Sequence, residues 1–294
     1  MISETNTSRS LSASESRLVL DLEWRDQRTV TLADLRALLG ASESYARFLA
    51  HRLVRKGWLE RLRPGLYRLI PANRGTEGIA DTNPLTAGAA LVEPYFFSFG
   101  TACTHHGFTE QVFAETYIAC QERRPSVIVR ETRYVFVSVP RDRFFGFAEM
   151  VVLGEAIQMA TPERALADAL DRPRYAGGVA EVSRMVSRAG GKISWDAMLN
   201  LLARWNESAL VQRLGYLLDL HGVAVPPDQR AALIARMRPS SKVVFGPRTR
   251  WGTEGKLVRP WNVVANVPEQ ELIEKGQPAR RRVSFGPPRS SGDR

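Results

Sequence analysis

Apolar residues in the first quarter of the chain recur at helical spacing. Over residues 14–23 and again over residues 42–56 they return every three or four positions, which predicts two amphipathic helices. A third helix is expected between them over residues 32–39, because Thr31 can cap its N-terminus and Gly40 suits the conformation that ends it. In the helix over residues 42–56 the expected buried stripe is Ala46, Leu49, Ala50 and Leu53.

The period then changes from helical to extended. Residues 58–62 and 66–70 have the composition of two strands. Residues 63–65 (Arg-Pro-Gly) supply a turn between them, because proline fixes φ and glycine accepts a positive φ. A short β-prone segment over residues 28–31 precedes the second helix. Three helices followed by a β-hairpin predict a winged helix-turn-helix over residues 14–71.

The rest of the chain predicts a second, larger domain over residues 84–270. Residues 72–83 are rich in Gly, Asn and Asp without an apolar period, which indicates a linker. The polar ends, residues 1–13 and 271–294, are expected to be disordered. The expected fold class is α+β, a winged helix-turn-helix followed by a larger mixed α/β domain. That domain is expected to contain strands at 95–98, 117–120, 126–129, 133–139, 155–159, 243–245 and 261–267, and helices at 85–91, 101–106, 161–170, 178–189, 194–205 and 208–221.

Positive charge is concentrated in the predicted winged helix and at the C-terminal end. The chain has 41 Lys and Arg against 31 Asp and Glu, a formal net charge of +10. Residues 40–75 hold eight basic and two acidic side chains, and residues 275–294 hold six and one, whereas residues 76–274 hold 22 of each. A basic module on a neutral body is typical of proteins that bind polyanions, because neutralised phosphates release condensed counterions. The tail either adds non-specific attraction to DNA or is a solubilising end without a role.

The helix over residues 42–56 is the expected recognition helix, which enters the major groove of DNA in such folds. Arginines can read guanine edges or clamp phosphates, serine and histidine can hydrogen-bond bases, and an aromatic ring can contact a thymine methyl. Three alternatives stay open: the arginines form a solvated face, Phe48 packs inside the protein, or this winged helix binds protein. The candidate DNA-binding residues are Ser42, Ser44, Tyr45, Arg47, Phe48, His51, Arg52, Arg55, Arg61, Arg63 and Arg68.

No constellation in the chain indicates catalysis. Phosphate-loop, serine-hydrolase and zinc-protease motifs are absent from the sequence. Cys103, His105 and His106 lie close together, but adjacent histidines on a helix point about 100° apart and nothing completes a tetrahedral metal set. We therefore expect no enzyme, no catalytic residue, no metal and no cofactor; a DNA-targeted nuclease is the enzymatic alternative.

Cysteine usage and hydropathy bear on location. The chain has two cysteines, a polar N-terminal segment and no apolar stretch of bilayer length. A cytoplasmic protein without membrane contact is expected.

Five segments together resemble the AbiEi family of antitoxins. The wing strand Gly65–Leu69 is similar to that of the family. Ser98–Phe108 resembles its S-x-x-[ST]-A-L-x-x-H-G-L segment, with Cys103 in place of Leu. The remaining three are Thr161–Leu170 (TPERALADAL), Arg213–Asp219 (RLGYLLD) and Trp261–Asn266 (WNVVAN), in the family's order.

The resemblance implies a DNA-binding antitoxin of a type IV toxin–antitoxin system. The winged helix would repress its own operon at double-stranded operator DNA with inverted repeats. The C-terminal domain would counteract an AbiEii-like nucleotidyltransferase toxin, with direct contact left open. We expect a monomer in solution and two copies on DNA. The alternative is a stand-alone winged-helix transcriptional regulator whose C-terminal domain senses a ligand or partner.

Two helices of the second domain carry a candidate partner surface. Arg164 and Asp168 share the helix over residues 161–170, and Arg213 and Tyr216 share the helix over residues 208–221. These polar side chains are the candidate contact to a partner. The alternative is an internal salt-bridged scaffold that holds the domain together.

Overall fold

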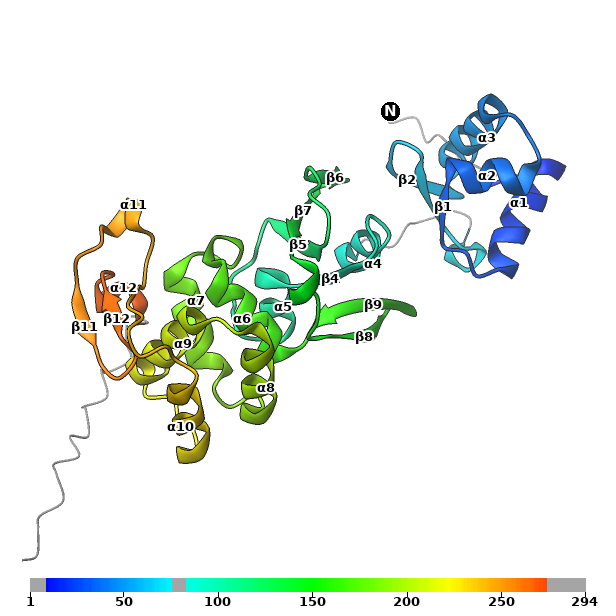
Figure 1. The fold of residues 1–294 in the computed structure, drawn as a ribbon. Coiled ribbons are helices and arrows are strands. Elements are labelled where there is room, and N and C mark those ends of the chain that lie inside the picture. Colours follow the sequence, from blue (N-terminus) through cyan, green and yellow to red (C-terminus); the bar gives the residue numbers. More distant parts are fainter. Residues whose placement is uncertain (1–8, 76–82, 274–294) are drawn as a thin grey trace, which may run out of the picture. The chain divides into compact units, whose positions relative to one another are not determined.

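The computed structural model describes residues 9–75 and 83–273. These residues form helices and mixed sheets of the α+β class, as expected (Figure 1). They divide into two compact units. Unit 1 comprises Met1–Thr101 and Phe113–Ala160, and unit 2 comprises Ala102–Val112 and Thr161–Arg294. Unit 1 therefore holds both the winged helix and a six-stranded sheet.

The winged helix-turn-helix is confirmed. Its helices α1 (Ala13–Trp24), α2 (Leu32–Leu39) and α3 (Glu43–Arg55) are followed by a β-hairpin. Strands β1 (Thr29–Thr31), β2 (Leu59–Arg63) and β3 (Leu66–Leu69) form an antiparallel sheet in the order β1-β3-β2. The predicted stripe of α3 lies in one core with apolar residues of α1, α2 and the wing: Leu18, Leu22, Val30, Leu35, Ala46, Leu49, Ala50, Leu53 and Leu59.

The segment before α1 is ordered from Arg9 onward. The Arg9 guanidinium lies 3.7 Å from the ring centroid of Trp58, and it donates to the carbonyl oxygens of Ile70 and Pro71. The Trp58 indole N–H in turn donates to the Arg9 carbonyl, at 2.9 Å. These contacts correct the predicted disordered lead of residues 1–13 at its C-terminal end; residues 1–8 lie outside the described residues.

The second part of unit 1 is a six-stranded sheet in the order β6-β7-β5-β4-β9-β8. β5 pairs with β7, and β4 with β9, in parallel, whereas the other neighbours are antiparallel. Helix α4 (Pro84–Ala89) contacts β9, β5 and β4. The strands are β4 (Tyr95–Phe97), β5 (Glu115–Cys120), β6 (Val127–Val129), β7 (Thr132–Ser138), β8 (Phe147–Val152) and β9 (Glu155–Ala160).

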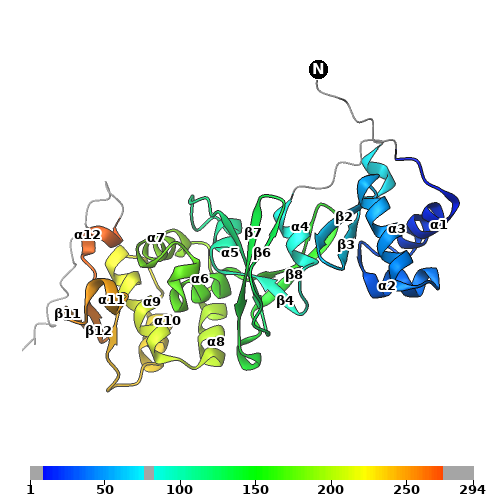
Figure 2. The same cartoon turned by 90° about the horizontal axis from the view of Figure 1, so that it is seen from above.

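Unit 2 is mainly helical (Figure 2). Helix α6 packs against α7, α8 and α9. A small sheet has the order β10-β12-β11, and Trp261 beside it is fully buried against Gly215 of α9. The helices are α5 (Phe99–His105, which enters from unit 1), α6 (Pro162–Asp171), α7 (Val179–Ala189), α8 (Trp195–Trp205), α9 (Ser208–His221), α10 (Pro227–Ala235), α11 (Arg248–Trp251) and α12 (Glu269–Leu272), and the strands are β10 (Val243–Val244), β11 (Lys256–Val258) and β12 (Val263–Ala265).

Most predicted elements of the larger domain exist, but five were missed. β8 and β11 are edge strands without a fully buried residue, and α10 buries only Leu233, so the apolar pattern of these elements is weak. The short helices α11 and α12 have four residues each, too few to show a period.

Candidate nucleic-acid interface

Helix α3 is positioned by local signals at its start. Gly40 adopts φ +57° and ends α2, so the chain can turn directly into α3. The Ser42 hydroxyl accepts a hydrogen bond from the Tyr45 backbone N–H, at 3.3 Å, which caps the new helix. The apolar stripe is buried, so the opposite face of α3 is presented to solvent.

The structure exposes seven of the eight candidate residues on and before α3. The Arg47 side chain is 66% exposed, and the aromatic residues Phe48 and Tyr45 are 54% and 42% exposed. The two rings lie 6.4 Å apart between centroids. Large aromatic side chains left in water cost free energy unless a partner covers them, which makes this face a candidate contact surface. The seven exposed residues are Ser42, Ser44, Tyr45, Arg47, Phe48, His51 and Arg55.

A carboxylate on the same face restrains two arginines. Glu43 accepts a hydrogen bond from Arg47, one turn later on α3, at 2.6 Å. Its other oxygen lies 3.8 Å from Arg36 of α2. All three side chains are at least half exposed, so these ion pairs are weak and water-screened. Arg36 was missed by sequence reasoning; the available signal was a basic residue in the last turn before the recognition helix.

Arg52 has a structural contact that its sequence position did not reveal. Its Nε lies 3.1 Å from Oε1 of Glu15, a fully buried carboxylate of α1. The same carboxylate accepts from Lys56 Nζ at 2.7 Å and from the Ser12 backbone N–H at 2.7 Å. Burial raises the pKa of Glu15, but the hydrogen bonds from Lys56 and Ser12 and the Lys56 charge outweigh it, so the pKa lies below its usual value. Glu15 therefore anchors the C-terminal half of α3 to α1.

The wing exposes two of its three candidate arginines. Arg61 and Arg63 are both exposed, and the register of β2 against β3 shifts between them, which marks a β-bulge. Arg63 also borders a hollow of about 490 Å³ lined by Thr86 and Glu155, so it lies on the side of the wing that faces the sheet. Arg61 does not line that hollow.

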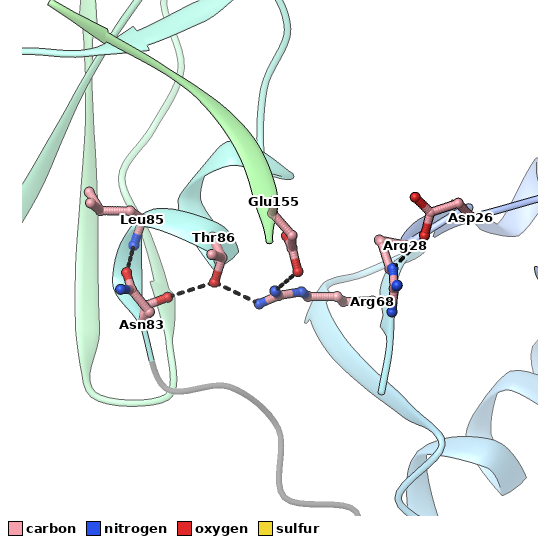
Figure 3. Close-up of polar contacts among 7 residues, drawn as sticks. All are labelled: Asp26, Arg28, Arg68, Asn83, Leu85, Thr86 and Glu155. Atoms are coloured by element: carbon pink, nitrogen blue, oxygen red, sulfur yellow. Dashed lines mark hydrogen bonds and ion pairs between the residues drawn. The ribbon is translucent and has the colours of Figure 1, made fainter. Parts of the chain in front are cut away.

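Arg68 is a correction to the predicted DNA-binding set. It is only 5% exposed, and its guanidinium donates to the Thr86 hydroxyl of α4 at 3.0 Å and pairs with the Glu155 carboxylate of β9 (Figure 3). Thr86 is itself fixed by the Asn83 carbonyl at 3.0 Å. A neighbouring ion pair joins Glu60 of β2 to Arg130 at 2.8 Å. Arg68 is thus used within unit 1, because a long side chain on a strand covered on both faces must find its partners inside the protein.

The predicted partner surface is wrong for three of its four residues. Arg164 and Asp168 are 0% and 2% exposed and form an ion pair of 2.8 Å within α6. Tyr216 is 3% exposed, and its ring packs edge-on against Phe245 at 5.1 Å. These contacts match the alternative of an internal scaffold. Arg213 is half-buried and lines a pocket of unit 2.

The sequence drew attention to Cys103 and its neighbouring histidines as a candidate metal site. Residues 9–75 and 83–273 contain no cluster of three His, Cys, Asp or Glu that could hold a metal ion. Cys103 is fully buried and donates weakly to the Ala165 carbonyl at 3.5 Å, and burial raises the pKa of its thiol. Within the same described residues, no helix has the length and apolar character needed to cross a bilayer.

The winged helix matches a known protein family. Residues 17–70 match the model of a family described as a transcriptional regulator, AbiEi antitoxin. The resemblance inferred from the sequence is thereby confirmed for this domain. Among curated proteins no match to the chain was found. The crystal structure of the RV2827C protein from Mycobacterium tuberculosis is similar, with a TM-score of 0.59 and 21% identity, covering 90% of this chain and 94% of that one. At this identity the likeness shows a shared fold alone.

Proposed function

We propose, from the premise that residues 17–70 form a regulator domain of the AbiEi antitoxin family, that this chain is an autorepressing antitoxin. Its winged helix binds operator DNA in the promoter of its own operon. Its remaining part counteracts a nucleotidyltransferase-like toxin of the AbiEii type. The protein acts in the cytoplasm and has no catalytic role of its own.

The observation that carries the DNA-binding part is the exposed face of α3. Arg47, Phe48, His51 and Arg55 project from a helix whose opposite face is fully buried. A helix presented in this way fits the major groove, where arginine reads guanine and an aromatic ring meets a thymine methyl. Arg61 on the wing is the candidate contact to the flanking phosphates.

Arg47→Ala tests base reading. The change is expected to cost about 1–3 kcal/mol of discrimination at the base that Arg47 contacts. Fluorescence anisotropy with the operon's own promoter duplex and a scrambled duplex gives that difference. Arg17→Ala, which removes another exposed arginine, on α1, is the matched control and is expected to leave the ratio unchanged. Equal binding of Arg47→Ala and parent to both duplexes would refute the assignment.

The salt dependence of binding tests the phosphate contacts. Four exposed arginines, namely Arg36, Arg47, Arg55 and Arg61, lie on α2, α3 and the wing. If each neutralises one phosphate, the logarithm of the binding constant falls with the logarithm of salt with a slope of about −4 per protomer. A palindromic site that binds two copies would double this slope. A flat response would remove the electrostatic argument.

The antitoxin part is tested by genetics. Where a nucleotidyltransferase-like gene adjoins the gene for this chain, co-expression of the two is expected to restore growth that the toxin alone arrests. A version that ends before α6 is expected to keep repression but to lose rescue. Repression without any toxin-like neighbour would instead support the alternative of a stand-alone regulator whose C-terminal part senses a ligand or partner.

A further inference from the structure

Unit 2 contains a pocket that the DNA-binding and antitoxin roles do not explain. Its volume is about 770 Å³, within the range of small-molecule sites. It is lined by the end of α6 and the turn after it, the start of α7, the first two turns of α9, and the segment from β10 to α11. All of these lie in unit 2. The lining brings together five basic side chains and one carboxylate: Arg172, Arg174, Arg213, Lys242, Arg248 and Asp171.

We propose that this pocket binds a small anionic molecule that carries a phosphate group and is of nucleotide size. The inference is independent of DNA binding by the winged helix. It rests on the incomplete pairing of the pocket's cations, on the uncapped start of α7 and on the apolar residues of the lining.

Only part of the positive charge is neutralised by the protein itself. Arg172 pairs with Asp171 at 3.3 Å, and Arg174 donates to the Tyr175 hydroxyl at 2.7 Å. Within the described residues, the side chains of Arg213, Lys242 and Arg248 make no hydrogen bond and no ion pair. Lys242 and Arg248 are exposed and screened by water, whereas Arg213 is half-buried; a bound anion would supply a counter-charge to all three.

Arg213 is the most buried of these three cations. It is half-buried, and its Nε is shielded from solvent without a hydrogen-bond partner. Burial lowers the pKa of Arg213, and the charges of Asp171 and Glu207 offset this only in part. An oxyanion in the pocket would supply the missing acceptor.

The start of α7 adds donors at the same place. Gly178 is its N-cap with φ +88°, and no side chain caps the helix. A Cβ built at Gly178 would have no neighbour within 4 Å, so open space lies beside the backbone there. The first amides of an eleven-residue helix, together with its dipole, favour an anion.

Apolar residues also line the pocket. Val179, Val243 and Val244 are half-buried, and Phe245 is buried and packed on Tyr216. A lining that combines cations with apolar side chains suits a ligand that carries both a phosphate and a flat ring. A DNA duplex is too wide to enter a cavity of this volume.

The test uses the full-length chain and isothermal titration calorimetry with ADP, inorganic phosphate and adenosine as probes. ADP is expected to bind, inorganic phosphate to bind more weakly and compete, and adenosine to bind least. The double substitution Lys242→Gln and Arg248→Gln is expected to weaken ADP binding at least about 10-fold, because charge-assisted contacts are lost. Arg250→Gln, on the same short helix but outside the lining, is the matched control.

The possible results separate the proposal from its competitors. Equal binding of phosphate and ADP would support the phosphate site and assign the free ion as its ligand. Absence of binding of both probes up to about 1 mM would overturn it. An unaltered ADP affinity in the double variant would also overturn it, as would an equal loss in Arg250→Gln. If the double variant lost duplex DNA binding while no probe bound, these cations would belong to a nucleic-acid surface instead. Arg213→Lys, which keeps the charge, provides a second variant if the double variant fails to fold.

Discussion

Removing the carboxylate of Glu15 is the sharpest test of how the recognition helix is held. Glu15 is fully buried in α1. Its carboxylate forms an ion pair with Arg52 and accepts hydrogen bonds from Lys56 and the Ser12 backbone N–H. Glu15→Ala deletes a capping interaction, which costs about 0.5–2 kcal/mol. It also breaks contacts to two cations. A fully buried pair would add about 3–5 kcal/mol, but the cations are 36% and 24% exposed and can turn to water. We therefore expect a total of about 2–3 kcal/mol.

Hydrogen–deuterium exchange of the full-length protein measures this cost locally. A loss of about 2–3 kcal/mol in local stability raises the exchange rate of α3 amides about 30- to 150-fold, for amides whose exchange follows the opening equilibrium of the helix. Peptides from α8 in unit 2 serve as an internal control and are expected to be unchanged. Glu43→Gln, which removes an exposed carboxylate from α3 itself, is the matched variant, and its expected loss of stability is less than about 1 kcal/mol. Parent-like protection of α3 in Glu15→Ala would refute the anchoring role.

The lowered pKa of Glu15 predicts that the stability of the winged helix depends on pH. The folded pKa of Glu15 is lowered, so its carboxylate stabilises the fold above the unfolded value of about 4.3. That contribution is lost as the pH falls through the folded pKa. The difference between parent and Glu15→Ala is therefore expected to be full at neutral pH and to narrow below about pH 4. A constant difference across this range would contradict the ionic explanation.

Three other substitutions have definite expected results. Glu43→Gln is expected to tighten promoter binding about 2- to 5-fold and to steepen its salt response, since Arg47 is released to contact DNA; anisotropy that shows weaker binding would argue against this. Arg68→Ala is expected to leave DNA affinity within about twofold, because the side chain is buried against Thr86 and Glu155; a loss as large as that of Arg47→Ala would return it to the interface. Gly215→Ala is expected to destabilise unit 2 by about 1–3 kcal/mol or more and so to lower its melting temperature, because the added Cβ would lie 2.1 Å from Trp261. An unchanged melting temperature in calorimetry would mean that the ring moves aside freely.

The winged helix could be predicted from sequence because its signals are local. Thr31 and Ser42 each cap the helix that follows them, and Gly40 adopts the left-handed conformation between the two helices. The apolar stripe of α3 has a clear helical period, and the hairpin turn carries proline and glycine. The same kind of signal placed α6, where Thr161 caps and Pro162 opens the helix. Elements without such signals, such as the exposed edge strand β8, were missed.

What the sequence determined by itself is therefore the order of elements and the concentration of positive charge in one domain, because caps, turns and periodicity act over a few residues. Tertiary structure decided how each charged side chain is used. Arg68 and Arg164 resemble surface arginines in sequence, yet both are buried with carboxylate partners, one of them 87 residues away. Arg213 and Lys242 come together in one pocket only because distant segments fold onto each other. Burial and pairing depend on contacts between segments far apart in the chain, and no local pattern encodes them.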